Sequence, residues 1–262
     1  MYTSNLSEIE WEVIEVIFHS HGLSDFGRKY PLRTVVDAIF YVVDNGVKWR
    51  NLPKDFPLWF SVYYNFKKWS DTGLWAEINQ SLVMFARDVS GRDENPSLVS
   101  IDSQSQSAEP GVKGRGLDGA KKINGRKRHL AVDVLGLVLL CICTRANESD
   151  RIAGERLVTR LNHKKDFPRL RKILGDLAYA NVGRSHQIPV CTQGASLRIK
   201  QKRQTGFVPE RFRWVVERTF AWLNRPRRLV RNYEKLIPVQ ESMNYIANIR
   251  ICLRKIKRAF QG

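Results

Sequence analysis

Cysteine is scarce in this chain. The 262 residues include four cysteines, of which only Cys141 and Cys143 lie close together in the sequence. Two residues apart on a strand they would share a face, but no second pair completes a zinc site. The cysteines are therefore expected to be buried thiols.

Long apolar runs are missing as well. The most apolar uncharged stretch, residues 134–144, is too short to cross a bilayer. The first residues include Glu8, Glu10, Glu12 and Glu15, which is not the basic start of a signal or transit peptide. We therefore expect a cytoplasmic protein.

Acidic side chains are outnumbered by basic ones. There are 26 Asp and Glu residues against 44 Lys and Arg residues, which gives a formal net charge of +18. This excess is larger than solubility requires and indicates a polyanionic partner. Nucleic acid is favoured over an acidic membrane surface, because no basic amphipathic helix or lipidation signal accompanies the charge.

The first part of the chain has the apolar periodicity of helices. Four helices are expected to start near residues 8, 32, 58 and 74. A turn with two prolines precedes the third helix, which is aromatic and basic, as in DNA-binding modules of the helix-turn-helix type. Small helical bundles that bind nothing have the same pattern, so both interpretations stay open.

After a linker-like stretch at residues 91–97, β patterns mix with helices. Strands are expected at residues 98–103, 128–134, 137–143 and 170–176, with further possible strands at 188–190 and 197–200. A turn at Leu135-Gly136 joins the second and third strands into a hairpin. The glycine-rich, cationic residues 111–125 are expected to form a loop. Later helices are expected from Ala153, around Glu217 and near the C-terminus.

Glu217 is the one carboxylate in residues 213–231, which are otherwise apolar or cationic. At helical spacing, Phe220 and Leu223 share one face, whereas Glu217 and Arg213 fall on another. One interpretation is an Arg213–Glu217 ion pair on a solvated helix. The other is that Glu217 joins further carboxylates in binding divalent metal, with arginines placed to receive nucleic-acid phosphates.

Asp102 and Asp176 each stand at the end of a predicted strand. The carboxyl ends of strands in an open α/β sheet meet at one edge, where sites form. Oxygen ligands hold Mg²⁺, and two ions about 3.5–4 Å apart can activate one oxygen on phosphorus and stabilise another. Taken singly, Asp102 could cap a turn with Ser103, and Asp176 could start a turn near Tyr179. Together with Glu217, the two aspartates favour the metal site.

Several motifs carry a resemblance to a known family. They are DSQS at residues 102–105, NGRKRHLAVD at 124–133, ANESD at 146–150, GDLAY at 175–179 and RWVVERTFAWLN at 213–224. From about residue 32 to residue 253, the chain resembles bacterial DDE transposases of the IS5 family, in the subgroup typified by IS1031 and IS427. The motifs WRNLP at residues 49–53 and YYNF at 63–66 are similar to the helical DNA-binding module of that family.

The resemblance implies an α/β fold, namely an RNase H-like mixed sheet flanked by helices, with an N-terminal all-helical, helix-turn-helix-like DNA-binding module. We expect that module at residues 1–92 and the catalytic domain, with the C-terminal helices, at residues 97–262. The resemblance also implies that Asp102, Asp176 and Glu217 are catalytic and bind two Mg²⁺ ions, for which Mn²⁺ can substitute.

The implied activity is that of a DNA transposase, a metal-dependent endonuclease and polynucleotidyl transferase. Such an enzyme binds the terminal inverted repeats of an insertion sequence, cleaves the element ends and transfers the 3′-hydroxyl ends to target DNA. Double-stranded DNA is then the partner, a homodimer or larger assembly holds the two ends, and the protein acts in the bacterial cytoplasm at the nucleoid. Two alternatives stay open: a catalytically silent, transposase-derived regulator, and an RNase H-like nuclease without strand transfer.

Basic residues near the acids and in the helical module are candidates for contacts with DNA phosphates. They are Lys48, Arg50, Lys67, Lys68, Lys121, Lys122, Arg126, Lys127, Arg128, Arg213, Arg225, Arg227, Arg228 and Arg231. Asn147 and Asp150 are candidates for supporting the metal ligands, and His129 for touching a phosphate, although each also has a purely structural interpretation.

Two positions depart from the broad family pattern, while Arg213 matches its signature arginine. Glu210 stands in place of a tyrosine, and Asn224 in place of a lysine, although the subgroup commonly has asparagine there. The phosphate contact implied for that lysine would then fall to Arg225, Arg227 or Arg228.

Overall fold

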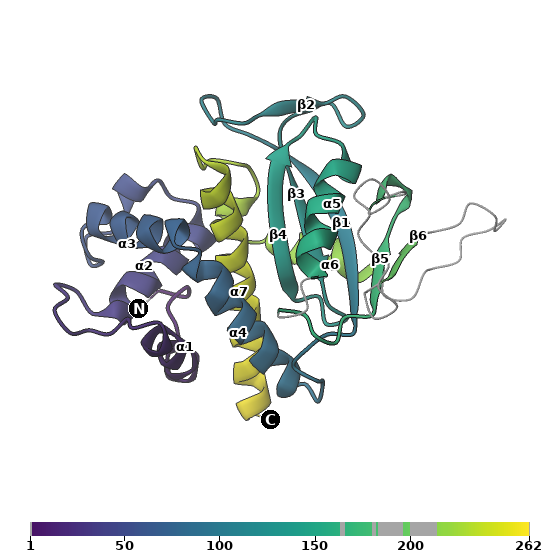
Figure 1. The fold of residues 1–262 in the computed structure, drawn as a ribbon. Coiled ribbons are helices and arrows are strands. Elements are labelled where there is room, and N and C mark those ends of the chain that lie inside the picture. The colour runs from purple at the N-terminus through teal and green to yellow at the C-terminus, as the bar shows by residue number, and fades with distance from the viewer. Residues whose placement is uncertain (1, 163–165, 180–181, 183–195, 200–213, 262) are drawn as a thin grey trace. The chain divides into compact units, whose positions relative to one another are not determined.

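The computed structural model describes residues 2–162, 166–179, 182, 196–199 and 214–261 (Figure 1). The chain divides into two compact units. The helical unit comprises Met1–Arg92 with Leu223–Gly262, and the sheet unit comprises Asp93–Trp222.

The helical unit confirms the expected helices of the N-terminal part. Its elements are α1 (Glu8–Ser20), α2 (Leu32–Asn45), η1 (Trp49–Asn51), α3 (Trp59–Asp71), α4 (Leu74–Asp88), η3 (Arg227–Leu229) and α7 (Ile237–Gln261). At the start of α1, the backbone and hydroxyl groups of Ser7 both donate to a carboxylate oxygen of Glu10, at 2.9 Å each. Gly46 ends α2 with a left-handed φ of +69°, which favours glycine.

The C-terminal helix α7 belongs to the core of the helical unit. Ile246, Ile249, Leu253 and Ile256 are buried, and the helix packs chiefly against α4 and also against α1, α2 and α3 (Figure 1). At the contact with α4, the Asn248 amide donates to Asn79 Oδ1 at 2.7 Å. The sequence predicts the C-terminal helices as part of the catalytic domain, whereas residues 223–262 belong to the same compact unit as the N-terminal helices. The reason is that the apolar face of α7 completes their core.

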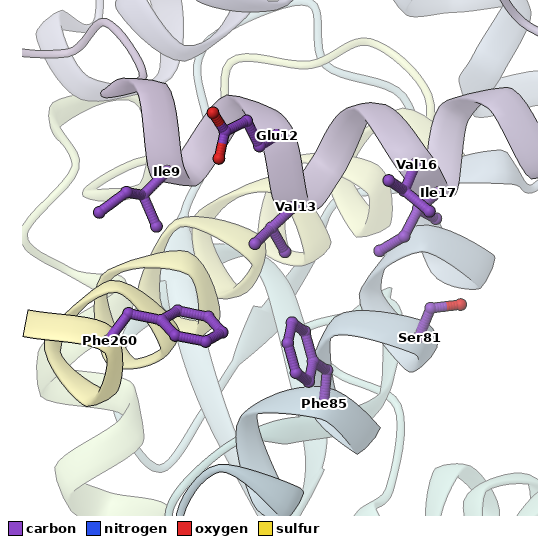
Figure 2. Close-up of a pocket in the computed structure, with 8 residues that line it drawn as sticks. All are labelled: Ile9, Glu12, Val13, Val16, Ile17, Ser81, Phe85 and Phe260. Carbon is purple, nitrogen blue, oxygen red and sulfur yellow. The ribbon is translucent and has the colours of Figure 1, made fainter.

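An apolar pocket of about 600 Å³ lies in the helical unit between α1, α4 and the end of α7 (Figure 2). Ile9, Val13 and Ile17 line it from α1, and Phe85 and Phe260 line it from α4 and α7. Phe260 remains 58% exposed. The apolar stripe of α1 is therefore only partly covered within this unit.

The sheet unit is built on a mixed sheet. Its strands are β1 (Leu98–Ser107), β2 (Gly116–Asp118), β3 (Ile123–Val132), β4 (Val138–Arg145), β5 (Lys172–Gly175) and β6 (Ser196–Ile199). The strand order is β4-β3-β1-β5-β6, and β2 pairs with the start of β3. The pairs β4-β3 and β3-β1 are antiparallel, whereas β1-β5 and β5-β6 are parallel.

Two helices cover the two faces of this sheet. On β1 and β3, Ser103 is paired with His129 and Gln104 with Arg128, and because side chains alternate along strands these two pairs lie on opposite faces. The pair Ser103 and His129 faces α5 (Asp150–Leu161), with Ser103 bonded to Asp150. Arg128 faces α6 (Trp214–Leu223), 5.4 Å from the Phe220 ring. The predicted α/β class, an RNase H-like mixed sheet flanked by helices, is confirmed.

One local expectation is corrected. The sequence predicts a loop at residues 111–125, whereas β2 and the first residues of β3 form a hairpin there, with Leu117 opposite Asn124. Main-chain pairing needs no alternation of apolar side chains, so the sequence pattern did not indicate it. The possible strand at residues 188–190 lies outside the described residues.

The remaining general expectations concern cysteines and membranes. Cys141, Cys143 and Cys252 are buried thiols, as predicted, while Cys191 lies outside the described residues. Within the described part of the chain, no helix combines the length and apolarity needed to cross a membrane.

Candidate active site

Asp102 lies on β1, and Asp176 directly follows β5, the parallel neighbour of β1. β1 and β5 pair through Leu98 with Lys172 and through Ser100 with Leu174. Asp102 and Asp176 each follow two residues after Ser100 and Leu174, and Gly175 lies against the Ile101 side chain, so continuing this register places the two aspartates next to each other. By the same alternation, both side chains belong to the α6 face of the sheet.

Each aspartate also makes a short-range bond to the backbone. The N–H of Ser103 donates to Asp102 Oδ1 at 2.7 Å, and that of Ala178 donates to Asp176 Oδ1 at 3.0 Å. The simpler interpretation of each residue as a turn cap is therefore present in the structure. These bonds hold the Asp102 carboxylate in the middle of β1, whereas the sequence predicts it at a strand end, and the Asp176 carboxylate directly after β5.

Glu217 is carried by α6, the helix on the same face as the two aspartates. Thr219 donates its hydroxyl to the carbonyl of Gly136 at 2.8 Å, and Arg218 donates to the carbonyl of Leu135 at 3.1 Å. These bonds attach α6 to the turn between β3 and β4. Glu217 is exposed and makes no hydrogen bond or ion pair with the described residues. Arg213, its predicted partner, lies outside the described residues, as does Glu210.

The three acids do not form one compact ligand set. Among the described residues, no group of three or more His, Cys, Asp or Glu side chains is close enough to hold a metal ion. The donor chemistry nevertheless suits magnesium, which commonly takes one or two carboxylates and completes its shell with water and substrate phosphate. The pair Asp102 and Asp176 meets that requirement, and Glu217 would have to approach it.

The pKa of Tyr179, in the 3₁₀ helix η2 (Leu177–Tyr179), reflects the carboxylates around it. Its side chain is fully buried. Burial, and then the negative charges of Asp102, Asp150 and Asp176, raise the pKa of Tyr179 far above its usual value. Three carboxylates thus lie close enough to act on one phenol, and Lys127 pairs with one of them, Asp150.

The opposite, α5 face holds a buried ion pair that sequence reasoning missed. Lys127 Nζ lies 3.0 Å from Asp150 Oδ1, and Ser103 donates its hydroxyl to the same oxygen at 2.8 Å. Lys127 also donates to the carbonyl of Glu148 at 3.1 Å. Since Ser103 follows Asp102 directly, this network holds the segment of β1 that carries the first catalytic candidate. The alternation of β1 and β3 was the available signal, because it puts Ser103 and Lys127 on one face.

His129 is part of the same buried cluster. Thr144 donates its only hydroxyl proton to the carbonyl of Arg145, so it must accept from His129 Nε2, 3.1 Å away. Nδ1 is then the bare nitrogen, 3.8 Å from Asp150 Oδ1. Burial lowers the pKa of His129 well below its usual 6.5, against the raising effect of Asp150, so the ring is neutral at pH 7. A fully buried, neutral ring is not placed to touch a phosphate.

Asp150 and Asn147 border a cavity of about 400 Å³, together with Lys127, Asp118 and Arg151. Asn147 packs its side chain against Gly116, where a Cβ atom would overlap the Asn147 amide oxygen. Asp150 reaches the site through Ser103, whereas Asn147 supports the β2 hairpin. Both positions agree with a supporting role and neither establishes one.

Of the basic cluster at residues 121–128, only the exposed members remain candidates for phosphate contacts. Lys121 and Lys122 are exposed, but Arg126, Lys127 and Arg128 are buried. Arg126 donates to the carbonyl of Lys113, and Arg128 donates to Gln104 Oε1 at 2.6 Å. Burial lowers the pKa of Arg128 to about 10, which still leaves it charged at neutral pH. The side chains of Arg126, Lys127 and Arg128 therefore make their contacts inside the sheet unit.

The basic residues of the helical unit are divided in the same way. Arg225, Arg227, Lys48, Arg50 and Lys68 are exposed, and Arg231 is half-buried. Arg228 is buried and pairs with Glu234, with an N–O distance of 2.6 Å. Lys67 pairs with Asp71 on the same helix. Arg228 is therefore engaged in the fold, while the exposed residues keep their charge at the surface.

Comparison with known proteins gives matches over both units. A family described as "Transposase DDE domain" matches residues 93–249, and one described as "Putative transposase of IS4/5 family" matches residues 6–79. A relative from Burkholderia cepacia, "Putative transposase for insertion sequence element IS402", is 30% identical over 149 residues, which cover 53% of this chain and 67% of the relative. No solved structure matches the chain. These matches agree with the expected IS5 family and do not test the subgroup.

Proposed function

The chain belongs to the family of transposases with a DDE domain, enzymes that cut and transfer DNA, and from this premise we propose that it acts on both ends of an insertion sequence. It binds the terminal inverted repeats, cleaves the element ends and joins the freed 3′-hydroxyl ends to target DNA. The neighbouring positions of Asp102 on β1 and Asp176 directly after β5, with Glu217 on the helix over the same face, carry this proposal.

Asp102 and Asp176 are the residues that would hold divalent metal, with Mg²⁺ as the natural ion and Mn²⁺ as a substitute. Glu217, on α6, would be the third ligand of such ions. When bound, two such ions would supply positive charge and an activated oxygen nucleophile for phosphoryl transfer. The protein's own part is to hold the carboxylates on one sheet edge and to prevent their mutual repulsion from separating them, through the backbone bonds of Ser103 and Ala178.

DNA is the partner of this family, and the exposed cations are our candidates for its phosphates. They are Lys48, Arg50, Lys68, Lys121, Lys122, Arg225 and Arg227, with Arg231 half-buried. Arg213 is retained from the motif alone. Because two element ends are held at once, we propose a homodimer or larger assembly on DNA, acting in the cytoplasm.

A nicking assay tests the proposal. The substrate is a plasmid that carries the element's two inverted repeats, and the variants are Asp102→Asn, Asp176→Asn and Glu217→Gln. We expect Mg²⁺-dependent nicking by the wild-type protein, a loss of about 10³-fold or more in each variant, and unchanged thermal stability. Asp88→Asn, an exposed carboxylate of α4, is the matched control and should cleave normally. Full activity in the three variants would remove the basis of the proposal.

A second candidate is a catalytically silent, DNA-binding regulator. The separation of the three acids among the described residues favours it. Specific binding of the repeats by a wild-type protein that never nicks them, with either metal, would support the regulator. A nuclease of the same fold would nick the DNA without giving strand-transfer products.

A further inference from the structure

The helical unit contains a second pocket, of about 400 Å³, between α7 and the segment that precedes α1. Arg250, Arg254, Lys257 and Arg258 line it from α7, and Glu10 is the acidic residue in its wall. The four basic residues recur at helical spacing on one side of α7. We call this feature the cationic pocket. None of these residues was singled out as a DNA contact from the sequence.

Arg250 forms the buried end of the cationic pocket. It is 7% exposed, and its Nη2 donates to the carbonyls of Thr3 and Asn5 at 3.3 Å each. Among the described residues, Nε and Nη1 of Arg250 find no hydrogen-bond acceptor. The Glu10 carboxylate oxygen is 3.7 Å from Nη1 and already accepts two bonds from Ser7. Buried guanidinium donors without acceptors are costly, and with Glu10 at 3.7 Å the charge of Arg250 is only partly compensated, which adds to the positive charge of the cationic pocket.

Arg254, Lys257 and Arg258 form the open end. No carboxylate in the described part of the chain forms an ion pair with any of the three. Cations near a helix C-terminus gain some stability from the helix dipole, which explains basic residues on any side of the last turns. It does not explain why they gather on the side of α7 where the buried Arg250 lies.

We propose that the cationic pocket binds a backbone phosphate of duplex DNA. The inference depends on the proposed function, in which DNA is the partner. It adds a phosphate contact that the helix-turn-helix-like module does not supply. Guanidinium groups suit phosphate because their donors match two of its oxygens. A lipid-binding surface would instead set exposed apolar side chains among the cations, whereas charged and polar side chains dominate this lining.

The test measures DNA affinity by fluorescence anisotropy at several salt concentrations, in the cleavage-defective Asp102→Asn background. The double variant Arg254→Gln/Lys257→Gln removes two pocket charges and leaves Arg250 in place. The matched control, Lys255→Gln/Arg92→Gln, removes two charges of the same unit that do not line the cationic pocket. We expect the pocket variant to lose about 5- to 10-fold in affinity and about 1 from the slope of log K against log salt, and the control to change by less than about 2-fold.

Thermal unfolding of both variants monitors folding. Equal losses in the pocket variant and the control would overturn the inference, since net charge alone would then account for them. Unchanged DNA affinity together with reduced binding to anionic lipid vesicles would overturn it in favour of a membrane surface. If the Asp102→Asn protein binds no DNA at all, the inference and the premise of a DNA partner both fail. Loss of nicking with DNA binding retained affects only the proposed catalytic function.

Discussion

The ammonium nitrogen of Lys127 lies 3.0 Å from a carboxylate oxygen of Asp150, and both groups sit against the strand that carries Asp102. The Lys127 side chain is 9% exposed and that of Asp150 is 24% exposed. Together with Ser103, this pair connects the start of α5 to the middle of β1. Lys127 therefore supports the candidate site by stabilising the part of the fold that carries Asp102.

Removing the charge of Lys127 should destabilise the protein. We expect Lys127→Met to lower the free energy of unfolding by about 2–3 kcal/mol, below the 3–5 kcal/mol typical of fully buried pairs because Asp150 is partly solvated. Asp150→Asn keeps an acceptor for Ser103 and should cost less. In a double-mutant cycle measured by urea unfolding, the coupling energy should be about 1–2 kcal/mol. Strictly additive losses would show that the two charges do not interact.

His129 should make stability depend on pH. Its pKa in the folded state is lowered below the unfolded value of 6.5 by burial, despite Asp150 and with Lys127 and Arg156 nearby. The contribution is therefore fully present above pH 6.5 and is lost as the pH falls, because the unfolded chain takes up the proton first. His129→Gln retains a donor for Thr144 but cannot titrate. Between pH 6 and pH 5, wild type should lose about 1 kcal/mol more than this variant. Parallel pH profiles would contradict the prediction.

The Thr219 hydroxyl should affect catalysis, because its bond to Gly136 holds α6, the helix that carries Glu217. Thr219→Val leaves the carbonyl of Gly136 without its hydroxyl donor and should cost about 1–2 kcal/mol of unfolding free energy. Because Glu217 lies on the same helix, nicking activity should fall while DNA affinity stays unchanged. Thr219→Ser keeps the donor and should restore most of the activity. Equal activity in the valine and serine variants would show that this bond does not position Glu217.

Arg228 and Arg225 should separate folding from DNA binding. Arg228→Met breaks a buried pair with Glu234 and should cost about 3 kcal/mol in urea unfolding. Arg225→Gln changes an exposed cation, so its stability should stay within about 0.5 kcal/mol of wild type while DNA affinity falls. If Arg228→Met lowered DNA affinity without lowering the free energy of unfolding, Arg228 would be a DNA contact.

Gly125 should tolerate no side chain. It lies at the junction of β1, β2 and β3, where a Cβ atom would be 1.9 Å from the carbonyl oxygen of Gln106. Gly125→Ala should therefore cost about 3 kcal/mol or more of unfolding free energy. Gly119→Ala meets no atom within 4 Å and should change stability by less than about 0.5 kcal/mol. Similar values for both would show that the strands separate easily at this point.

Much of the fold could be predicted because it depends on local patterns. Helices α1 to α4 followed from apolar spacing and from signals such as Ser7 and Gly46, and β1 and β5 from short apolar runs that end in aspartate. The β2 hairpin could not be predicted, since its pairing is made by backbone groups. The packing of α7 against the N-terminal helices could not be predicted either. Periodicity shows which face of a helix is apolar, but it does not show which element covers that face.

The candidate site was predictable in its residues and much less so in its surroundings. Asp102, Asp176 and Glu217 followed from position and motif, but their final spacing depends on how α6 lies over the sheet. The burial of Arg126, Lys127 and Arg128 was missed, because a run of cations normally indicates surface. Here Arg128 contacts Gln104 and Phe220, and Lys127 pairs with Asp150. Only tertiary pairing distinguishes such an interior cation from one that meets solvent.

Because α7 completes the core begun by residues 1–92, that core is made from the first and the last parts of the chain. During synthesis on the ribosome, the early helices must wait until residues 237–261 have emerged before their apolar surface is covered. A nascent or truncated chain that ends before residue 237 would therefore expose that surface to chaperones and proteases. The sheet unit, continuous between residues 93 and 222, has no such delay.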